Sequence, residues 1–420
     1  MPRVVVGRDL EDLKRLGEKG TILLGKHIVG KGEEAHLTSP ILMDVMRPHC
    51  ILICGKRGSG KSFTMGVIAE EMMKLDEELR NKLSVVIIDT QGIFWSMRER
   101  NEKDVVLLDE WNLQPKGFNV SLYVPQGHAR AFEKAGVSYE DVYSIEPNDL
   151  TAEDWALAFG IDMNSLLGIL LGRVVRHMEG KYDLNDMIEQ VYKEERFDEK
   201  TKMMLENLFL GAKDWGIFSK KGIDVLELLK PGKVSVIDVS LFSGMAKGWS
   251  VRSLLVGLLV KKIYEARVVA RKAEEVSTIT GGESEEVPYC WIMMDEAHNF
   301  VPPDAMTAAS DPLLMVVAQG RQPGISTVFI TQRPNRLHPT VIAQCDLVIS
   351  HRLTSKADID ALRAVMQTYM LYDIEKYLND LPRMPGVALI LDDNSERLYS
   401  IRVRPRQSWH AGASPIIESS

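Results

Sequence analysis

The chain has 420 residues, of which 45% are hydrophobic, so it is long enough to bury a large core. Its net charge of −8 excludes a protein-wide basic field, so any nucleic-acid site must be a local strip of Lys and Arg. Four cysteines are too few for a disulfide scaffold, and they lie in or near apolar runs without metal-binding spacing. With no signal peptide and no apolar run of about 18 residues, the composition predicts a soluble, cytoplasmic protein with no membrane segment.

Residues 1–49 contain three short strand-like pieces, separated by glycines and charged residues: Val4–Val6, Thr21–Gly25 and His27–Val29. This pattern predicts a short N-terminal β segment. A complete small barrel generally needs more chain than these residues supply. We therefore place the first boundary at residue 49, before the next apolar strand.

The segment from Gly55 to Ser62 matches G-x-x-x-x-G-K-[ST] at every fixed position. It follows the apolar run Cys50–Cys54 and precedes a helical pattern over residues 63–72, which is the strand, loop and helix order of a phosphate-binding loop. The alternative is a glycine-rich turn with an incidental lysine. We expect Lys61 to contact the β- and γ-phosphates of ATP and the Ser62 hydroxyl to bind Mg²⁺. The predicted nucleotide-binding residues are Gly55, Lys56, Arg57, Gly58, Ser59, Gly60, Lys61, Ser62 and Phe63.

Apolar runs and helical patterns alternate after this loop. Strands are expected at Ser84–Asp89, which ends in a carboxylate, and at Val105–Leu108. Residues from about 130 to 230 predict a helical insertion, within which Thr151 and Asp154 form a helix-capping pattern. A strand at 234–240 and a long helix at 251–272 follow, and the polar stretch 272–287 predicts a mobile surface loop.

The last third of the chain returns to strands. They are expected at 289–294, 326–330 and 347–350, with a hairpin of 387–391 and 399–403 and a mobile arm after Pro405. Strands that alternate with helices predict an α/β fold with a mostly parallel sheet. The sequence therefore divides into the N-terminal β segment at 1–49, an ATPase domain at 50–406 and a tail at 407–420.

Two carboxylates, Asp295 and Glu296, end the apolar strand that begins at Tyr289. Carboxyl ends of parallel strands are where ligand sites form in α/β folds. Asp295 suits the coordination of Mg²⁺, and Glu296 suits activation of the attacking water. The alternative is a helix N-terminus that carries acidic residues for its dipole.

Three further residues are candidates for contact with the γ-phosphate. Gln332 ends the next strand and could contact the phosphate or the lytic water, although it could equally be a glutamine in a turn. Arg321 precedes that strand and Arg352 follows the one after it. Either arginine could reach a γ-phosphate across a subunit boundary, or could be a surface arginine paired with a carboxylate.

The combined motifs resemble the HerA/FtsK superfamily of ring-forming P-loop ATPases, nearest the HerA branch. The strings that carry this resemblance are Asp295–Phe300, Thr331–Pro334, Ala343–Asp346, Arg352–Thr354 and Val403–Arg406. The resemblance implies a RecA-like core that forms a hexamer with ATP at subunit interfaces. It implies that Lys61 and Ser62 bind nucleotide, Asp295 binds Mg²⁺, Glu296 is the catalytic carboxylate and Gln332 is a sensor. It favours Arg321 over Arg352 as the arginine that acts in trans.

The function that the resemblance implies is an ATP-driven DNA translocase or helicase acting on double-stranded DNA. Proteins of the HerA branch carry an N-terminal β-barrel associated with a nuclease partner, and residues 1–49 are short for one. Two alternatives remain, a scaffold or regulatory subunit of an anti-phage defence or nuclease complex, and an ATPase that energises transport. Candidate DNA-contacting residues are Arg98, Arg100, Lys247 and Arg252, unless these are ordinary solvated charges.

Overall fold

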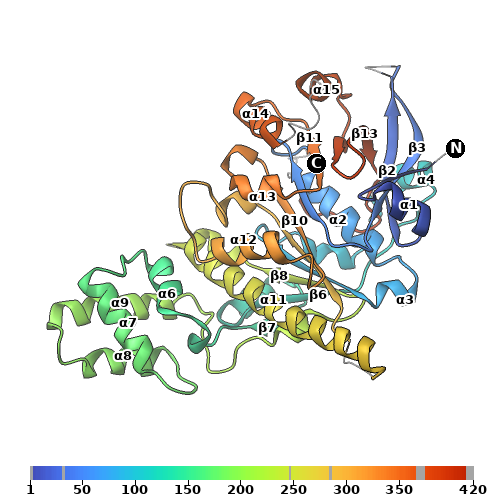
Figure 1. The fold of residues 1–420 in the computed structure, drawn as a ribbon. Helices are drawn as coiled ribbons and strands as arrows, with labels where there is room; N and C mark the ends of the chain where they lie inside the picture. Colours follow the sequence, from blue (N-terminus) through green and yellow to red (C-terminus); the bar gives the residue numbers. More distant parts are fainter. Residues whose placement is uncertain (1–2, 31–33, 246, 283–285, 366–373, 413–420) are drawn as a thin grey trace.

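The computed structural model describes residues 3–30, 34–245, 247–282, 286–365 and 374–412. Within them, thirteen strands form one sheet with helices on both faces (Figure 1). The strand order is β1-β3-β2-β13-β12-β11-β4-β10-β9-β5-β8-β6-β7, and the strands from β11 to β7 run parallel to one another. The predicted α/β class with a mostly parallel sheet is confirmed.

The strands have the following bounds: β1 Val4–Val6, β2 Thr21–Val29, β3 His36–Asp44, β4 Cys50–Cys54, β5 Leu83–Asp89, β6 Val120–Pro125, β7 Asp141–Tyr143, β8 Val234–Asp238, β9 Tyr289–Met294, β10 Ile325–Thr331, β11 Leu347–His351, β12 Val387–Asp392 and β13 Arg397–Val403. The predicted hairpin near the end of the chain is the antiparallel pair β12 and β13.

The helices have the following bounds: α1 Leu10–Leu16, α2 Lys61–Met72, α3 Glu77–Arg80, α4 Val105–Glu110, α5 Ala129–Ala135, α6 Ala152–Phe159, α7 Leu166–His177, α8 Leu184–Lys193, α9 Glu199–Lys213, α10 Val225–Leu228, α11 Gly248–Thr280, α12 Ser310–Gln319, α13 Pro339–Ala343, α14 Lys356–Val365 and α15 Ile374–Asp380.

The central strands are apolar on both sides because each face of the sheet is covered. On β4, Cys50 and Leu52 pack into a core with α11 and the helices of the insertion, whereas Ile51 and Ile53 pack on the opposite face with α2. Alternate residues of a strand point to opposite faces, so two cores require a continuous apolar run. Placing β4 at the centre of the sheet fixes the glycine-rich loop that follows it.

Helices α6 to α9 form a lobe that projects from the body of the molecule (Figure 1). Thr151 and Asp154 cap α6 reciprocally, as the capping pattern predicts. Trp155 anchors the lobe, because its ring packs against Phe159, Phe209 and Phe218. The region from 130 to 230 is mainly helical, but it also supplies β7 at the edge of the sheet.

The N-terminal strands extend the central sheet rather than standing apart from it. Strand β2 pairs with β13 and with β3, and β3 was not expected from sequence because its first half mixes polar residues with a proline. Buried charges tie this region to the core. Arg8 pairs with Asp44 at 2.6 Å, and His49 lies between Asp44 and Asp346, at 3.2 and 2.6 Å.

The predicted strand at 105–108 is wrong, because these residues form helix α4. Val105 and Val106 are exposed and only Leu108 is fully buried, so the segment packs by one helical face. The place beside β8 that a further strand would take is occupied by β6.

The predicted mobile loop at 272–287 is wrong for its first part, because α11 continues to Thr280. Ion pairs of Arg267 and Arg271 with Glu274, and of Arg271 with Glu275, link neighbouring turns of this helix. The helix ends only at Gly281, which adopts φ 71°.

The predicted mobile arm after Pro405 is also wrong for residues 406–412, and residues 413–420 lie outside the described residues. Arg406 and Ser408 are fully buried and bond to Glu70 of α2. Glu70 lies 336 positions before Arg406 and 338 before Ser408, so no local pattern could indicate this contact.

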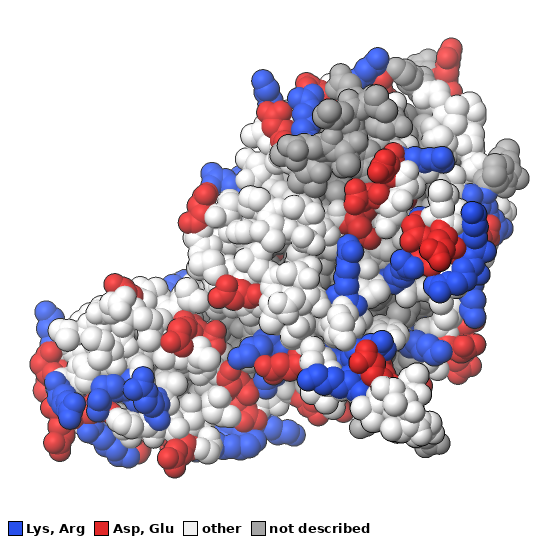
Figure 2. Space-filling view, in the orientation of Figure 1, with Lys and Arg blue, Asp and Glu red and all other residues white. Residues whose placement is uncertain are grey.

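Acidic and basic side chains are interspersed over the face of the molecule seen in Figure 2. This arrangement agrees with the net charge of −8. No single sign of charge covers the face seen in Figure 2.

Candidate nucleotide-binding site

The glycine-rich loop joins the end of β4 to the start of α2. Gly55 has φ 152° and Gly60 has φ 105°, which are values that residues with a side chain rarely adopt. A Cβ at Gly55 would also lie 2.6 Å from the Cβ of His351 and from Ser59 Oγ. The loop therefore curls tightly, and the N–H groups of the first turn of α2 have no intrahelical acceptor and can bind an anion.

Lys61 lies at the start of α2 with its side chain folded over the loop. Its Nζ donates to the carbonyl of Lys56 at 3.1 Å. Burial lowers the pKa of Lys61, while the charges of Asp295 and Glu296 oppose this effect. The ammonium is thus held beside the loop by a backbone oxygen that a phosphate oxygen can replace.

Asp295 lies at the end of β9 and faces the loop. Its Oδ2 accepts hydrogen bonds from Ser62 Oγ and from Gln91 Nε2, both at 2.9 Å. Burial raises the pKa of Asp295. A hydroxyl and a carboxylate are hard oxygen ligands of the kind Mg²⁺ prefers, so these residues fit a magnesium ion.

Glu296, the next residue, adopts a left-handed conformation with φ 52°. Its Oε2 is buried and accepts no hydrogen bond. Burial and the charge of Asp295 raise the pKa of Glu296 to about 7. A carboxylate with a strained backbone, an oxygen that accepts no hydrogen bond and a pKa near neutrality is well suited to accept a proton.

His298 and Thr331 join Glu296 to the neighbouring strand. His298 Nδ1 bonds to Thr331 Oγ1 at 3.0 Å and lies 3.4 Å from Glu296 Oε2. Burial lowers the pKa of His298 to about 4, so the imidazole is neutral at pH 7. Gln332 follows Thr331, and β10 lies between β4 and β9, so Gln332 sits between the loop and Glu296.

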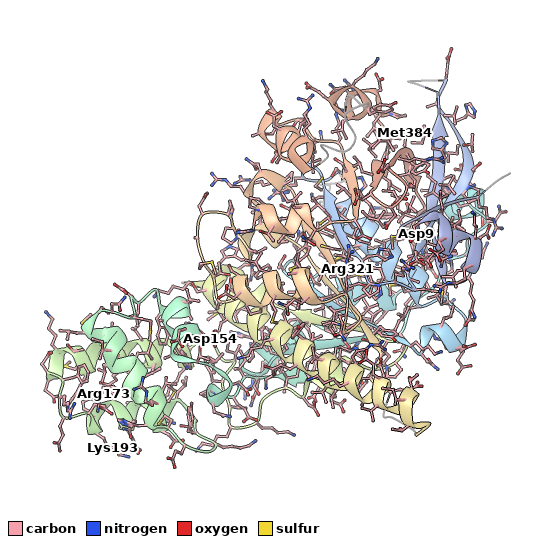
Figure 3. All side chains as sticks on the ribbon, viewed as in Figure 1. Asp9, Asp154, Arg173, Lys193, Arg321 and Met384 are labelled. Carbon is pink, nitrogen blue, oxygen red and sulfur yellow. The ribbon has the colours of Figure 1, made fainter. Side chains whose placement is uncertain are left out.

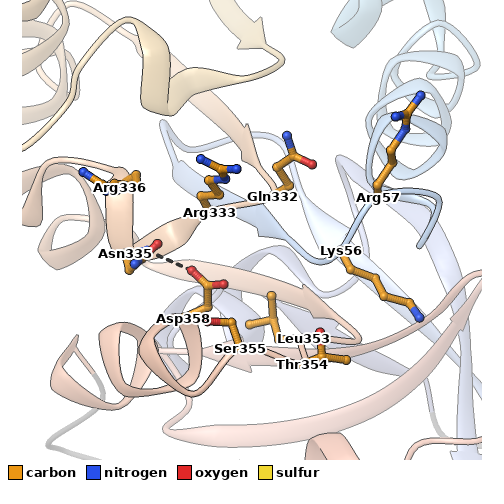
Figure 4. A pocket seen from close by; sticks show the side chains of 10 residues that line it. All are labelled: Lys56, Arg57, Gln332, Arg333, Asn335, Arg336, Leu353, Thr354, Ser355 and Asp358. Atoms are coloured by element: carbon orange, nitrogen blue, oxygen red, sulfur yellow. Dashed lines mark hydrogen bonds between the residues drawn. The ribbon is translucent and has the colours of Figure 1, made fainter.

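A cleft of about 970 Å³ runs along the glycine-rich loop. Its polar part contains Gly58–Phe63, Asp295, Glu296 and Gln332. A second pocket of about 360 Å³ adjoins it and is shown in Figure 4. Lys56 and Arg57 lie on one side of this basic pocket, and Arg333 and Arg336 on the other.

Residues 23–264 match the family model described as the central domain of the HerA helicase. The chain belongs to the HerA central-domain family. The resemblance to the HerA branch is therefore confirmed. The match covers the glycine-rich loop and Gln91, and it ends before Asp295.

Two curated HerA relatives illustrate the similarity. The DNA double-strand break repair helicase HerA of Sulfurisphaera tokodaii is 21% identical over 354 residues, which are 83% of this chain and 62% of that protein. The protein of the same name from Pyrococcus furiosus is 25% identical over 175 residues, which are 38% of this chain and 29% of that protein. The chain thus spans less than two thirds of the length of these relatives.

Two solved structures share the fold. VirB4 of Thermoanaerobacter pseudethanolicus has a TM-score of 0.56 at 15% identity, and the match covers 92% of this chain and 97% of VirB4. The bacterial conjugative coupling protein TrwB has a TM-score of 0.52 at 12% identity, covering 93% of this chain and 96% of TrwB. Among the described residues of the HerA-family chain, no helix is long and apolar enough to cross a membrane.

The two candidate arginines of this HerA-family chain lie at opposite ends of the parallel strands. Arg352 follows β11 and its carbonyl accepts the N–H of Lys56 at 3.0 Å, so its backbone supports the loop. Arg321, labelled in Figure 3, precedes β10 at the amino ends of the strands. Both side chains are exposed, and neither lines the cleft of its own chain.

Two of the predicted DNA-contacting residues are engaged inside the protein. Arg252 is 2% exposed and donates to the carbonyls of Val239 and Ser240, at 2.9 Å each. Arg98 donates to the carbonyl of Val120 at 2.7 Å. Arg252 is therefore unavailable to DNA, whereas Lys247 and Arg100 are exposed.

The sequence interpretation missed several residues of the site. Gln91 could have been found, because it follows the strand-end carboxylate of Asp89, whose oxygens accept four backbone N–H groups of the turn. Thr331 belongs to the string Thr331–Pro334 that carries the family resemblance, but the sequence assigns it no role. The residues Arg402, Val403, Pro405, His410 and Gly412 also line the cleft.

Proposed function

We propose that this HerA-family chain is an ATP-hydrolysing ring motor that acts as a translocase or helicase on double-stranded DNA. The observation that carries the proposal is the carboxylate of Glu296, which lines the cleft with Lys61 and Gln332, accepts no hydrogen bond at Oε2 and has a raised pKa, as suits a proton acceptor. The family match supports the assignment.

Each residue has a role in the proposed hydrolysis. Lys61 and the N–H groups of the loop hold the β- and γ-phosphates of ATP, and Ser62 and Asp295 hold Mg²⁺. When bound, the Mg²⁺ ion neutralises charge on the phosphate oxygens. Glu296 accepts a proton from the attacking water, and Gln332 orients that water. Gln91, which bonds to Asp295, keeps that carboxylate turned toward Ser62.

We propose that six copies form the ring, with ATP at each subunit interface. Arg321 supports this arrangement, because an exposed arginine at the edge opposite its own cleft is free to reach the cleft of a neighbour. Arg352 is the second candidate, because its side chain is also exposed and does not line the cleft of its own chain.

The basic pocket of Figure 4 is the proposed contact for DNA phosphates, in place of Arg252. Lys56, Arg57 and Arg333 are exposed, and Arg336 has a carboxylate partner only at 3.8 Å, in Asp304. Phosphate contacts of this kind bind without reading sequence. The pocket touches Gln332, which offers a physical link between DNA and ATP hydrolysis.

The test is the ATPase rate of the intact chain with and without long duplex DNA, at two salt concentrations. We expect stimulation by DNA and binding that weakens steeply with salt. Arg336→Ala should weaken binding equally for all sequences and reduce the salt dependence, whereas Arg196→Ala, an exposed arginine of the helical lobe, should change neither.

One result of this test would contradict the proposed function. If a preparation verified as hexameric shows no stimulation of its ATPase rate by DNA and no salt-sensitive DNA binding, the proposed function as a motor is contradicted. That outcome favours the alternative in which the ring is a scaffold or regulatory subunit for a nuclease or defence partner.

A further inference from the structure

We propose that a strap of residues 404–412 forms the base-binding wall of the nucleotide cleft, where His410 holds the purine of the bound nucleotide. This inference rests on the proposed function, since it assigns the nucleoside end of the same site. The strap lines the cleft through Pro405, His410 and Gly412.

The position of the strap follows from the direction of the cleft. The loop and Asp295 place the phosphates at the start of α2, so the nucleoside must lie farther along the cleft. Phe63, the residue after Ser62, marks that direction, and the His410 ring lies 5.5 Å from the Phe63 ring in an edge-on arrangement. A Cβ at Gly412 would lie 3.2 Å from Ile93 Cδ1, so the strap spans the space between Phe63 and Ile93.

The strap packs on one face of α2. Phe63, Gly66 and Glu70 are spaced three and four positions apart, so they share a face of the helix. A Cβ at Gly66 would lie 2.7 Å from the guanidinium carbon of Arg406, so glycine leaves the room that Arg406 needs. The strap therefore docks on the same helix whose first turn binds the phosphates.

Glu70 is the anchor of this contact. Its carboxylate accepts from Arg406 Nε at 3.1 Å and from the N–H groups of Gln407 and Ser408 at 3.0 and 3.1 Å, and it pairs with Arg404 at 2.9 Å. Burial alone would raise the pKa of Glu70, but the two guanidinium groups lower it. This buried network of ion pairs and hydrogen bonds holds the strap against α2.

The chemistry of His410 suits a purine. Its Nδ1 lies 3.1 Å from Arg406 NH1, and because a guanidinium only donates, Nδ1 accepts and the ring proton lies on Nε2. Burial and the charge of Arg406 lower the pKa of His410 to about 4, so the ring is neutral at pH 7. A neutral aromatic ring with one N–H donor can stack on a base and donate to one of its acceptors.

The experiment compares binding of ATP with binding of inorganic triphosphate, which lacks the nucleoside. His410→Ala should weaken ATP binding by about tenfold, the usual size of a lost base-stacking contact, and leave triphosphate binding unchanged. His410→Phe should keep most of the ATP affinity. Trp409→Ala is the matched control, because only the backbone of Trp409 bonds to Glu99 and Ser96 and its side chain does not line the cleft.

The outcomes separate the inference from the function on which it rests. Equal ATP affinity in His410→Ala and the unchanged protein, or equal weakening of ATP and triphosphate, overturns the base-binding wall. An unchanged protein that binds ATP with the expected His410 dependence, yet does not hydrolyse it, contradicts the proposed motor alone. An unchanged protein that binds no ATP overturns both.

Discussion

At the scale of the residue, the site depends on two adjacent carboxylates with different environments. Asp295 is hydrogen-bonded to Ser62 and Gln91, whereas Glu296 Oε2 accepts no hydrogen bond and lies 3.4 Å from His298 Nδ1. Adjacent acidic groups whose surroundings differ can take different tasks, one as a metal ligand and one as a base. The backbone of Glu296 is left-handed, with φ 52°, whereas Asp295, at the end of the strand β9, has an ordinary conformation.

Glu296→Gln should therefore keep ATP binding and lose turnover by on the order of 10²–10⁴, because an amide of the same size cannot accept the proton. In the unchanged protein, Glu296 is the active base only above its pKa of about 7, so kcat should rise from pH 6 to pH 8. Single-turnover hydrolysis across this pH range measures both effects. Unchanged turnover in Glu296→Gln would contradict the assignment of Glu296 as the base.

At the scale of the element, buried charges connect strands that the hydrophobic pattern alone would not align. His49 precedes β4, Asp44 ends β3 and Asp346 precedes β11, so one imidazole joins three strands. Burial would lower the pKa of His49, but the carboxylates of Asp346 and Asp44 raise it to about 9. The protonated ring therefore contributes to stability at neutral pH.

The difference between the folded and unfolded pKa of His49 determines how the free energy of unfolding changes with pH. His49 has a higher pKa folded than unfolded, so its contribution is full below about pH 6.5 and is lost as the pH rises through about 9. The shift corresponds to about 3 kcal/mol in the free energy of unfolding. His49→Gln should be less stable, and its free energy of unfolding should fall less between pH 6.5 and 9.5. Urea unfolding at these pH values checks this, and parallel curves for the two proteins would contradict it.

At the scale of the whole molecule, the cleft lies at the carboxyl ends of the parallel strands, and Arg321 lies at their amino ends. A head-to-tail ring brings opposite faces of neighbouring copies together, which suits a site completed in trans. Arg321→Ala should bind ATP normally and hydrolyse it poorly, since such arginines contribute about 10³–10⁵ in rate.

Mixing Arg321→Ala with Lys61→Ala subunits should restore some activity, because one kind of mixed interface keeps both Lys61 and Arg321. ATPase rates across a titration of the two proteins measure this. If mixing restores nothing, while mixtures of Arg352→Ala and Lys61→Ala recover, then Arg352 is the residue that acts in trans.

The sequence by itself determined the class of fold and the polar part of the cleft. Buried parallel strands must be continuously apolar, and the residues that follow them meet at one edge of the sheet. The loop Gly55–Ser62, the carboxylates Asp295 and Glu296, and Gln332 could therefore be placed together from local patterns. Helix α4 was mistaken for a strand because short apolar runs fit either structure.

Only the tertiary structure decided which charged residues are free and what closes the cleft. Arg252 looks solvated in the sequence, yet backbone carbonyls of a neighbouring turn bury it. The strap looks like a polar tail, yet Arg404 and Arg406 pair with Glu70 and Glu71 on α2. Burial of a charge depends on partners brought together by folding, and these partners are separated by more than 300 positions. Local sequence carries no record of such distant pairs, so the nucleoside end of the site emerges only from the folded chain.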